Sequence, residues 1–249
     1  MSGHNKWSSI KHRKGRQDAK RGKVFTKVIK EITIAARAGG GDPSGNARLR
    51  RAIDEARANN MPADNIDRAI KKGTGELEGV SYEELTYEGV GPGGTLVMVE
   101  VTTDNRNRTN AEIRKVFERH GGTLGQGGSA GWAFDQKGVV RVAREAATEE
   151  QLFEVAVGAG AEDLRAEEER WVITCARTDL DVIRDAVDAA GIPVAESKLE
   201  QIAKLDKELD GEDGKANLTL LEALDDHDDV NQVFSDFVPS EALLAELGE

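Results

Sequence analysis

The chain of 249 residues has one cysteine, five prolines and aromatic side chains at only 4% of its positions. The single cysteine, Cys175, has no partner for an intrachain disulfide, which excludes a secreted disulfide scaffold and favours a reducing compartment. No apolar run approaches the roughly eighteen residues of a membrane span. The N-terminus is basic but has no apolar segment of the kind found in secretory signals. These absences leave a globular chain of ordinary composition.

Basic residues are scarce outside the N-terminal third. The whole chain carries 34 Lys+Arg and 46 Asp+Glu, a formal net charge of −12. Residues 1–72 hold 18 basic and 7 acidic side chains, whereas residues 73–249 hold 16 basic and 39 acidic ones. A basic end on an acidic body indicates that the basic end binds a polyanion.

The first 23 residues contain eight Lys or Arg and one acid, and too few apolar residues to bury themselves. We therefore expect an arm or a loosely docked helix. Neutralising phosphates releases condensed counterions, so cations here predict nucleic-acid binding without sequence readout. The aromatic rings of Trp7 and His12 could stack on bases, although Trp7 could equally anchor the arm. The predicted cationic contacts are Lys6, Lys11, Arg13, Lys14, Arg16, Lys20, Arg21, Lys23 and Lys27.

Three apolar patterns at helical spacing follow the basic segment. The first ends at the glycines 39–41, the second covers about 46–59, and the third begins at Pro62 and ends at Gly73. Short helices with short connections predict a small helical domain over residues 1–80.

Strands and helices alternate after Gly73. Residues 95–102 predict a strand, and Thr109 with Glu112 fits a capping box at the start of a helix. The order of patterns over 138–199 is βαββαβ, which is typical of a ferredoxin-like unit. An acidic linker over 206–215 leads to one more helix and one more strand.

We expect this last helix and strand to complete the sheet that begins near residue 81. The predicted fold class is therefore α+β, with an N-terminal three-helix domain followed by two α/β domains, one inserted in the other. The predicted boundaries are 1–80, 81–134 with 204–240, and 135–203.

A second candidate for nucleic-acid contact covers residues 104–119, which contain all five cations of residues 73–133. Guanidinium and amide groups can form two parallel hydrogen bonds to a phosphate or a base edge. This favours contacts from Asn105, Arg106, Asn107 and Arg108. The alternative is a loop in which the asparagines satisfy local backbone groups. We favour contact because two arginines at a helix start oppose the helix dipole without an obvious structural gain.

Several segments match the residue pattern of an enzyme motif but lack the flanking secondary structure that the motif requires. The glycines 89, 91 and 94 match a dinucleotide fingerprint, but a strand and not a helix follows them. Ser129 lies in a nucleophile-elbow pattern that also lacks its helix. The acidic run at 206–217 departs from a calcium loop, and the histidines and Cys175 show no metal-ligand spacing. We predict no enzyme activity, no metal and no cofactor, and we expect the acidic run 225–229 to be a solvated helix end and turn.

Seven segments resemble one known family closely. They are GHNKWSSIKHRK, QDAKRGKVFTK, IKEITIAARAGGGDP, NNMPADNIDRAIKKGTG, YEGVGPGG, TDNRNRT and HGGTLGQGGSAGWAF. Together they are similar to the YebC/PmpR family over residues 1–238. Members of this family carry the label of probable transcriptional regulators, and a mitochondrial relative is a translational activator.

The resemblance implies a three-domain cytoplasmic protein without a cofactor. It implies contacts from the basic arm and from the loop 104–109, and weaker ones from Lys71 and Lys72. We predict a non-enzymatic regulatory protein that binds DNA through its basic N-terminal domain. The alternative is a ribosome-associated translation factor that contacts ribosomal RNA and relieves stalling, for example at proline runs. An enzyme acting through the glycine-rich segments and a protein-interaction adaptor are alternatives from other classes.

Overall fold

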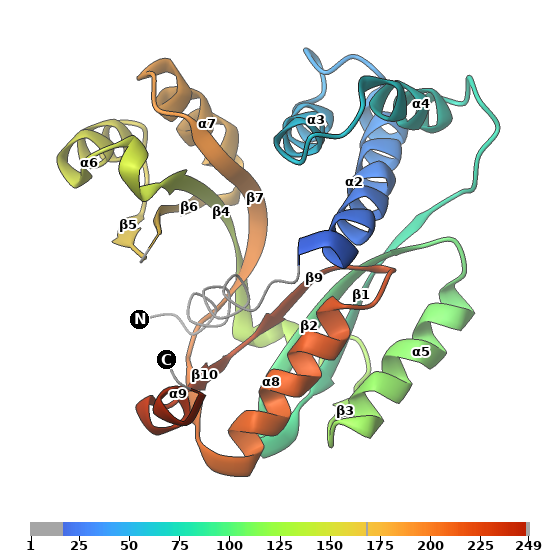
Figure 1. The fold of residues 1–249 in the computed structure, drawn as a ribbon, viewed down its shortest axis with the longest axis vertical. Coiled ribbons are helices and arrows are strands. Elements are labelled where there is room, and N and C mark those ends of the chain that lie inside the picture. The colour runs from blue at the N-terminus through green and yellow to red at the C-terminus, as the bar shows by residue number, and fades with distance from the viewer. Residues whose placement is uncertain (1–16, 168, 248–249) are drawn as a thin grey trace.

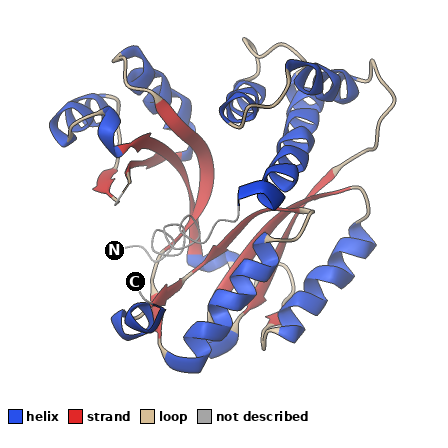
Figure 2. Ribbon diagram, in the orientation of Figure 1, coloured by secondary structure: helices blue, strands red, loops and turns tan. Residues whose placement is uncertain are grey.

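A computed structural model describes residues 17–167 and 169–247 of the chain (Figures 1 and 2). The architecture is α+β, with a group of helices beside two sheets of four strands each. The predicted fold class is therefore confirmed. The domain limits given above stay a prediction.

The helical unit contains three helices that share one core. They are α2 (Gln17–Gly39), α3 (Ala47–Ala58) and α4 (Ala63–Thr74). Ile32 of α2 and Leu49 of α3 are fully buried in this core. Asn46 caps α3 because its side-chain oxygen accepts a hydrogen bond from the Leu49 amide at 3.1 Å.

Gly73 has a different role from the expected helix stop. The helix continues to Thr74, and Gly75 ends it with φ of 83°. Gly73 is buried where α4 crosses α2, and a Cβ atom there would clash with the Thr33 carbonyl and lie 2.7 Å from the Ala36 Cβ. Only glycine allows the two helices to approach this closely.

The first sheet combines segments from both ends of the chain. Its order is β3-β1-β2-β9, and β2 pairs antiparallel with both β1 and β9. The strands are β1 (Glu83–Val90), β2 (Leu96–Thr103), β3 (Thr123–Leu124) and β9 (Val230–Ser235), and a turn, η1 (Pro92–Gly94), joins β1 to β2. Two helices, α5 (Arg106–Arg119) and α8 (Gly211–Asp225), run side by side along one face (Figure 1). The expected completion of this sheet by the last helix and strand is confirmed.

The second sheet has the order β5-β6-β4-β7 with antiparallel neighbours throughout, which is the ferredoxin-like arrangement. The strands are β4 (Phe134–Ala143), β5 (Asp163–Ala166), β6 (Arg170–Ala176) and β7 (Val194–Ala203). The helices and short turns are α6 (Glu149–Gly158), α7 (Leu180–Ala189), η2 (Gly131–Ala133), η3 (Arg144–Ala146) and η4 (Arg177–Asp179). The strands β4 and β7 are long and extend from the first sheet to α6 and α7 at the far end of this unit (Figure 1).

The predicted acidic linker over 206–215 is wrong. Residues 207–209 form β8 (Lys207–Leu209), which pairs in parallel with β10 (Phe237–Pro239), and α8 already begins at Gly211. Glu212 and Asp213 lie in the first turn of α8, where negative charge is favourable beside the helix N-terminus. The described chain ends in α9 (Glu241–Leu247).

The predicted capping box at Thr109 is also wrong. The cap of α5 is Asn105, whose side-chain oxygen accepts from the Arg108 amide at 3.1 Å. Thr109 is buried one turn into the helix. Among the described helices, none combines the length and apolar character needed to cross a membrane.

Candidate nucleic-acid interface

Three lysines on one face of α2 contact the end of α8 and the turn after it. Their spacing of four and three residues places them on adjacent turns of the helix. Lys23 Nζ donates to the Asp226 carbonyl at 2.7 Å, and Lys27 Nζ donates to the Asp225 carbonyl at 2.9 Å. Lys30 Nζ donates to the Asp228 carbonyl at 3.0 Å. Cations are favourable beside these carbonyls, because the C-terminal end of a helix carries partial negative charge.

Asp229 is the centre of the contact. Its carboxylate accepts from Lys30 Nζ at 2.7 Å, Arg108 Nη2 at 2.8 Å and Thr109 Oγ1 at 2.7 Å. Burial alone would raise the pKa of Asp229, but these donors outweigh it and hold the pKa well below its ordinary value. Asp229 therefore stays ionised and joins α2 to the start of α5.

The acidic run 225–229 is a helix end and turn, as the sequence predicts, but it is only partly solvated: Asp226 and Asp228 are exposed, whereas Asp229 is buried. Lysines from α2 and Arg108 from α5 satisfy its carbonyls and one of its carboxylates. The pairing brings together two segments that sequence reasoning treated as separate contact candidates.

Arg108 has a structural role that the sequence argument missed. Besides Asp229, it donates to Asp104 Oδ1 at 2.9 Å, and these two carboxylates raise the pKa of its guanidinium further. Asn105 is likewise engaged as the cap of α5. The expectation that arginines at this helix start lack a structural gain is wrong for Arg108.

A groove of about 710 Å³ lies between α5, the start of α2 and the turn 225–229. Four cations and four acids line it. The cations are Lys23, Arg108, Lys115 and Arg119, and the acids are Glu112, Asp226, Asp228 and Asp229. Lys115 and Arg119 are exposed, and within the described part of the chain neither makes a hydrogen bond or ion pair. The free positive charge of the groove therefore lies along α5.

The other predicted contacts are distributed as follows. Lys71 and Lys72 are exposed at the end of α4, and Arg106 and Asn107 are exposed in the first turn of α5. Lys20 and Arg21 belong to α2, but the structure does not describe their side chains. Seven predicted contacts lie outside the described residues, namely Lys6, Trp7, Lys11, His12, Arg13, Lys14 and Arg16.

Lys115 and Arg119 lie in the segment 104–119 that the sequence predicts as a second contact, although the residues favoured within it were Asn105, Arg106, Asn107 and Arg108. The sequence carries a signal for them, since residues 108, 112, 115 and 119 have the spacing of one helix face. The spacing alone does not show whether this helix face lies beside Lys23 of α2 or packs against the sheet.

A larger cleft of about 1410 Å³ separates α2 and α3 from β7 and is a weaker candidate for a polyanion. Nine basic and eight acidic side chains line it, so its charges nearly cancel, as do those of the smaller groove. Several of its arginines are already paired. Arg48 binds Glu31, and Arg141 binds Glu200 in a buried pair at 2.6 Å.

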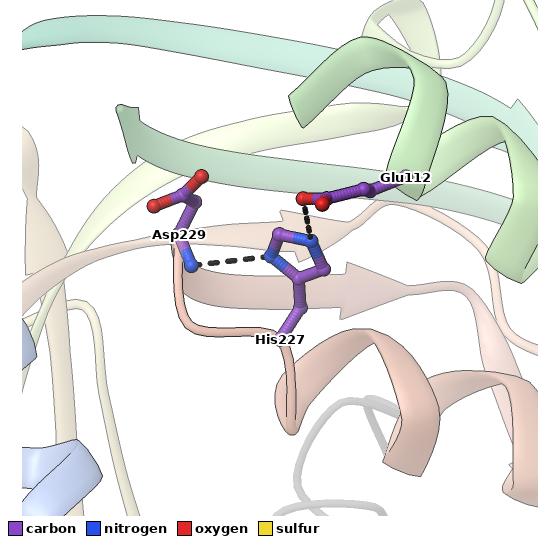
Figure 3. A group of neighbouring side chains, drawn as sticks. All are labelled: Glu112, His227 and Asp229. Atoms are coloured by element: carbon purple, nitrogen blue, oxygen red, sulfur yellow. Dashed lines mark hydrogen bonds and ion pairs between the residues drawn. The ribbon is translucent and has the colours of Figure 1, made fainter. Parts of the chain in front are cut away.

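One cluster in the described chain has metal-ligand chemistry. Glu112, His227 and Asp229 each place a ligand atom within 4.8 Å of the others (Figure 3). The histidine ring is fully engaged, however: Nδ1 accepts from the Asp229 amide at 3.1 Å, and Nε2 lies 3.1 Å from Glu112 Oε2. Lys30 and Arg108 already neutralise Asp229. The arrangement fits an ion-paired contact between elements better than a metal site.

The two motifs that resembled enzyme sites have other structures. Residues 91–94 form the turn between β1 and β2, and a strand rather than a helix follows them in the chain. Ser129 precedes the short turn η2 and not an α-helix, and its buried Oγ has no hydrogen-bond partner among the described residues. Neither motif supplies the geometry that its chemistry needs.

Two family models match the chain and together cover most of it. The TACO1/YebC protein N-terminal domain matches residues 5–76, and the TACO1/YebC second and third domain matches residues 82–237. A relative from Desulfosudis oleivorans is 54% identical over 94% of this chain and 96% of its own. A relative from Chlorobaculum tepidum is 51% identical over the full length of both chains. Each relative bears the name "probable transcriptional regulatory protein".

A solved structure is similar over nearly the whole chain. It is the crystal structure of a conserved hypothetical protein from Aquifex aeolicus, with a TM-score of 0.86 and 43% sequence identity. The match covers 91% of this chain and 94% of that one. The names of the two sequence relatives describe regulation, whereas the name of the solved protein states no function.

Proposed function

Since the chain belongs to the TACO1/YebC family, we propose that it is a cytoplasmic, non-enzymatic regulatory protein that acts in transcription by binding DNA. The names of the relatives support the regulatory role. The basic N-terminal segment and the exposed face of α5 are the proposed contacts with the phosphate backbone.

The observation that carries this proposal is that basic residues of α2 and of α5 line one groove of a molecule that is acidic overall. The helix α5 carries five Lys or Arg and two Glu, whereas residues 73–249 as a whole hold 16 basic and 39 acidic residues. Lys23, from the basic segment, lines the same groove as Lys115 and Arg119. Cations from both elements can therefore contact one phosphate backbone while the acidic body limits non-specific association.

The proposed contact on the first sheet is made by long charged side chains of α5. The exposed face of α5 is dominated by arginine, lysine and glutamate. Such a surface suits phosphate and shape contacts better than direct reading of a long operator.

The test is the salt dependence of DNA binding by the full chain. The double variant Lys115→Glu/Arg119→Glu should bind a labelled duplex more weakly. The slope of log K against log salt should become shallower by about 2, because each lost phosphate contact removes roughly 0.9. A matched control is Arg37→Glu/Arg177→Glu, which makes the same charge change at exposed positions that line neither the groove nor the larger cleft.

The control should keep the wild-type slope. Equal slopes for the α5 variant and the control would contradict the assignment of the contact to α5. Binding of structured RNA in strong preference to the duplex would favour the translation-factor alternative. An intact full-length chain that binds neither nucleic acid at low salt would overturn the proposal.

A further inference from the structure

We propose that the loop between β3 and β4 is a binding site for an unpaired nucleobase, with the indole of Trp132 as the stacking platform. This inference rests on the proposed nucleic-acid function and names a second contact for it. The loop covers residues 125–133 and ends in the short turn η2 (Figure 1).

The first observation is the exposure of Trp132. Its side chain belongs to a residue that is 67% exposed, whereas the other tryptophan of the described chain, Trp171, is 4% exposed. The indole nitrogen donates to the Ser129 carbonyl at 3.1 Å. The polar edge of the ring is therefore satisfied within the loop, and what the loop presents to solvent is ring surface.

The second observation is that the loop is held rigidly although it is rich in glycine. The carboxylate of Glu88 accepts hydrogen bonds from the backbone amides of Gly128, Ala130 and Gly131, at 2.8, 2.6 and 2.6 Å. Burial alone would raise the pKa of Glu88, but the three amides outweigh it and lower the pKa. The Glu88 carbonyl also accepts from the Gly125 amide at 2.8 Å.

Contacts from the following unit fix the other side of the loop. Lys204 Nζ donates to the Trp132 carbonyl at 2.9 Å, and the Lys204 amide donates to the Ala133 carbonyl at 2.9 Å. A ring that is already positioned loses little conformational entropy when a flat ligand stacks on it. Burying an aromatic ring is favourable, so an exposed ring needs other interactions to hold it in place. Here the hydrogen bonds of the loop keep the ring of Trp132 exposed to solvent.

The surroundings favour a nucleobase over a protein surface. Near the ring, residues 125–128 are exposed, and Lys204 has a half-exposed ammonium group that lies 3.5 Å from Asp135 Oδ1. Leu205 is 82% exposed close by in the chain, but the other exposed large apolar residues lie in other elements. One aromatic ring with polar neighbours and a cation is the arrangement used to bind bases of unpaired strands. A protein partner would need a broader apolar patch.

The experiment compares single-stranded oligodeoxyadenylate with the same strand paired to oligothymidylate, using the full chain. Trp132→Ala should weaken binding of the single strand by about tenfold, the scale of one base–aromatic stack. Trp132→Phe should retain most of the affinity, because phenylalanine keeps a stacking face. Binding of the duplex should be unchanged in both variants, since its bases are already stacked on each other.

Phe153→Ala is the matched control, because Phe153 is an aromatic residue 57% exposed on α6 and outside the loop. It should bind both probes like the wild type. An independent readout is quenching of indole emission by the single strand in a Trp7→Phe background, which should disappear in Trp132→Ala.

Two outcomes would overturn the inference while leaving the proposed function intact. In one, Trp132→Ala binds the single strand like the wild type, while Lys115→Glu/Arg119→Glu still weakens duplex binding. In the other, Trp132→Ala weakens binding of both probes equally, which would make the ring a general contact and not a base platform. Failure of the wild type to bind either probe at low salt would instead contradict the proposed function itself.

Discussion

Replacing Asp229 should loosen the helical unit from the first sheet. The carboxylate is 7% exposed and receives charged hydrogen bonds from Lys30 and Arg108. Lys30 is itself 9% exposed, so removal of Asp229 leaves an ammonium group buried without its counter-ion. Breaking one side of a buried pair typically costs about 3–5 kcal/mol.

The expected cost for Asp229→Ala is toward the lower end of that range, about 3 kcal/mol. Lys30 retains hydrogen bonds to the carbonyls of Thr102 and Asp228, which soften the loss. Asp229→Asn keeps a hydrogen-bond acceptor and should cost less. Combining it with Lys30→Met should cost less than the sum of the single changes, because the methionine removes the uncompensated charge.

Urea denaturation measures the total change, and amide hydrogen exchange locates it. Exchange should accelerate in α2 and the start of α5, whereas β4 and β7 should keep their protection. Asp104→Asn is the control, since Asp104 also binds Arg108 but is 38% exposed, and surface pairs contribute no more than about 1 kcal/mol.

The pH dependence provides a second readout with a defined sign. The folded pKa of Asp229 lies below its ordinary value of 3.8, so its stabilising contribution is complete above that value and is lost as the pH falls through the folded pKa. The stability difference between wild type and Asp229→Asn should therefore shrink in acid. A change below about 1 kcal/mol for Asp229→Ala, or unchanged exchange in α2, would refute the reasoning.

Three further changes have expected outcomes. Arg141→Met should destabilise the chain by about 3 kcal/mol in urea denaturation, because it removes the guanidinium paired with the buried Glu200 and leaves Lys198 at 3.5 Å. Adding Glu200→Leu should recover much of the loss, and no recovery would argue against the pairing. Gly73→Ala should lower the free energy of unfolding by about 1–3 kcal/mol, because the added methyl group overpacks the contact between α2 and α4. Gly127→Ala, whose methyl group would meet open space, should lower it by less than about 0.5 kcal/mol. Equal melting temperatures of the two variants would contradict this contrast. Glu88→Gln should loosen the loop that carries Trp132 at neutral pH. The folded pKa of Glu88 lies below its ordinary value of 4.5, so its contribution is complete above 4.5 and is lost as the pH falls through the folded pKa, where the wild type should loosen likewise. Constant indole anisotropy would count against this prediction.

The secondary structure and the fold class were largely predictable from the sequence. The βαββαβ order over 138–199 agrees with the strands β4 to β7 and the helices α6 and α7. Periodicity predicts such elements well because it reflects the burial of residues two to four positions apart. The prediction failed where local signals compete, as at Thr109, since Asn105 offers an equally good cap one turn earlier.

The candidate site was predictable in composition but not in arrangement. The sequence shows that cations concentrate before residue 73 and between residues 104 and 119. It does not show which of them remain free. Lys30 and Asp229 are 199 residues apart in the chain, and no local pattern links them.

The sequence by itself therefore determined the helices and strands, the separation of charge along the chain and the basic character of its N-terminal third. The tertiary structure decided which charges cancel, because a cation and a carboxylate neutralise each other only when packing brings them within a few ångströms. In the folded protein Lys30 and Arg108 form ion pairs with Asp229, whereas Lys115 and Arg119 are exposed to solvent. Trp132 lies on a loop that hydrogen bonds hold in place. These outcomes depend on contacts between elements far apart in the chain, and the free energy of such contacts is set by burial and geometry and not by neighbouring residues.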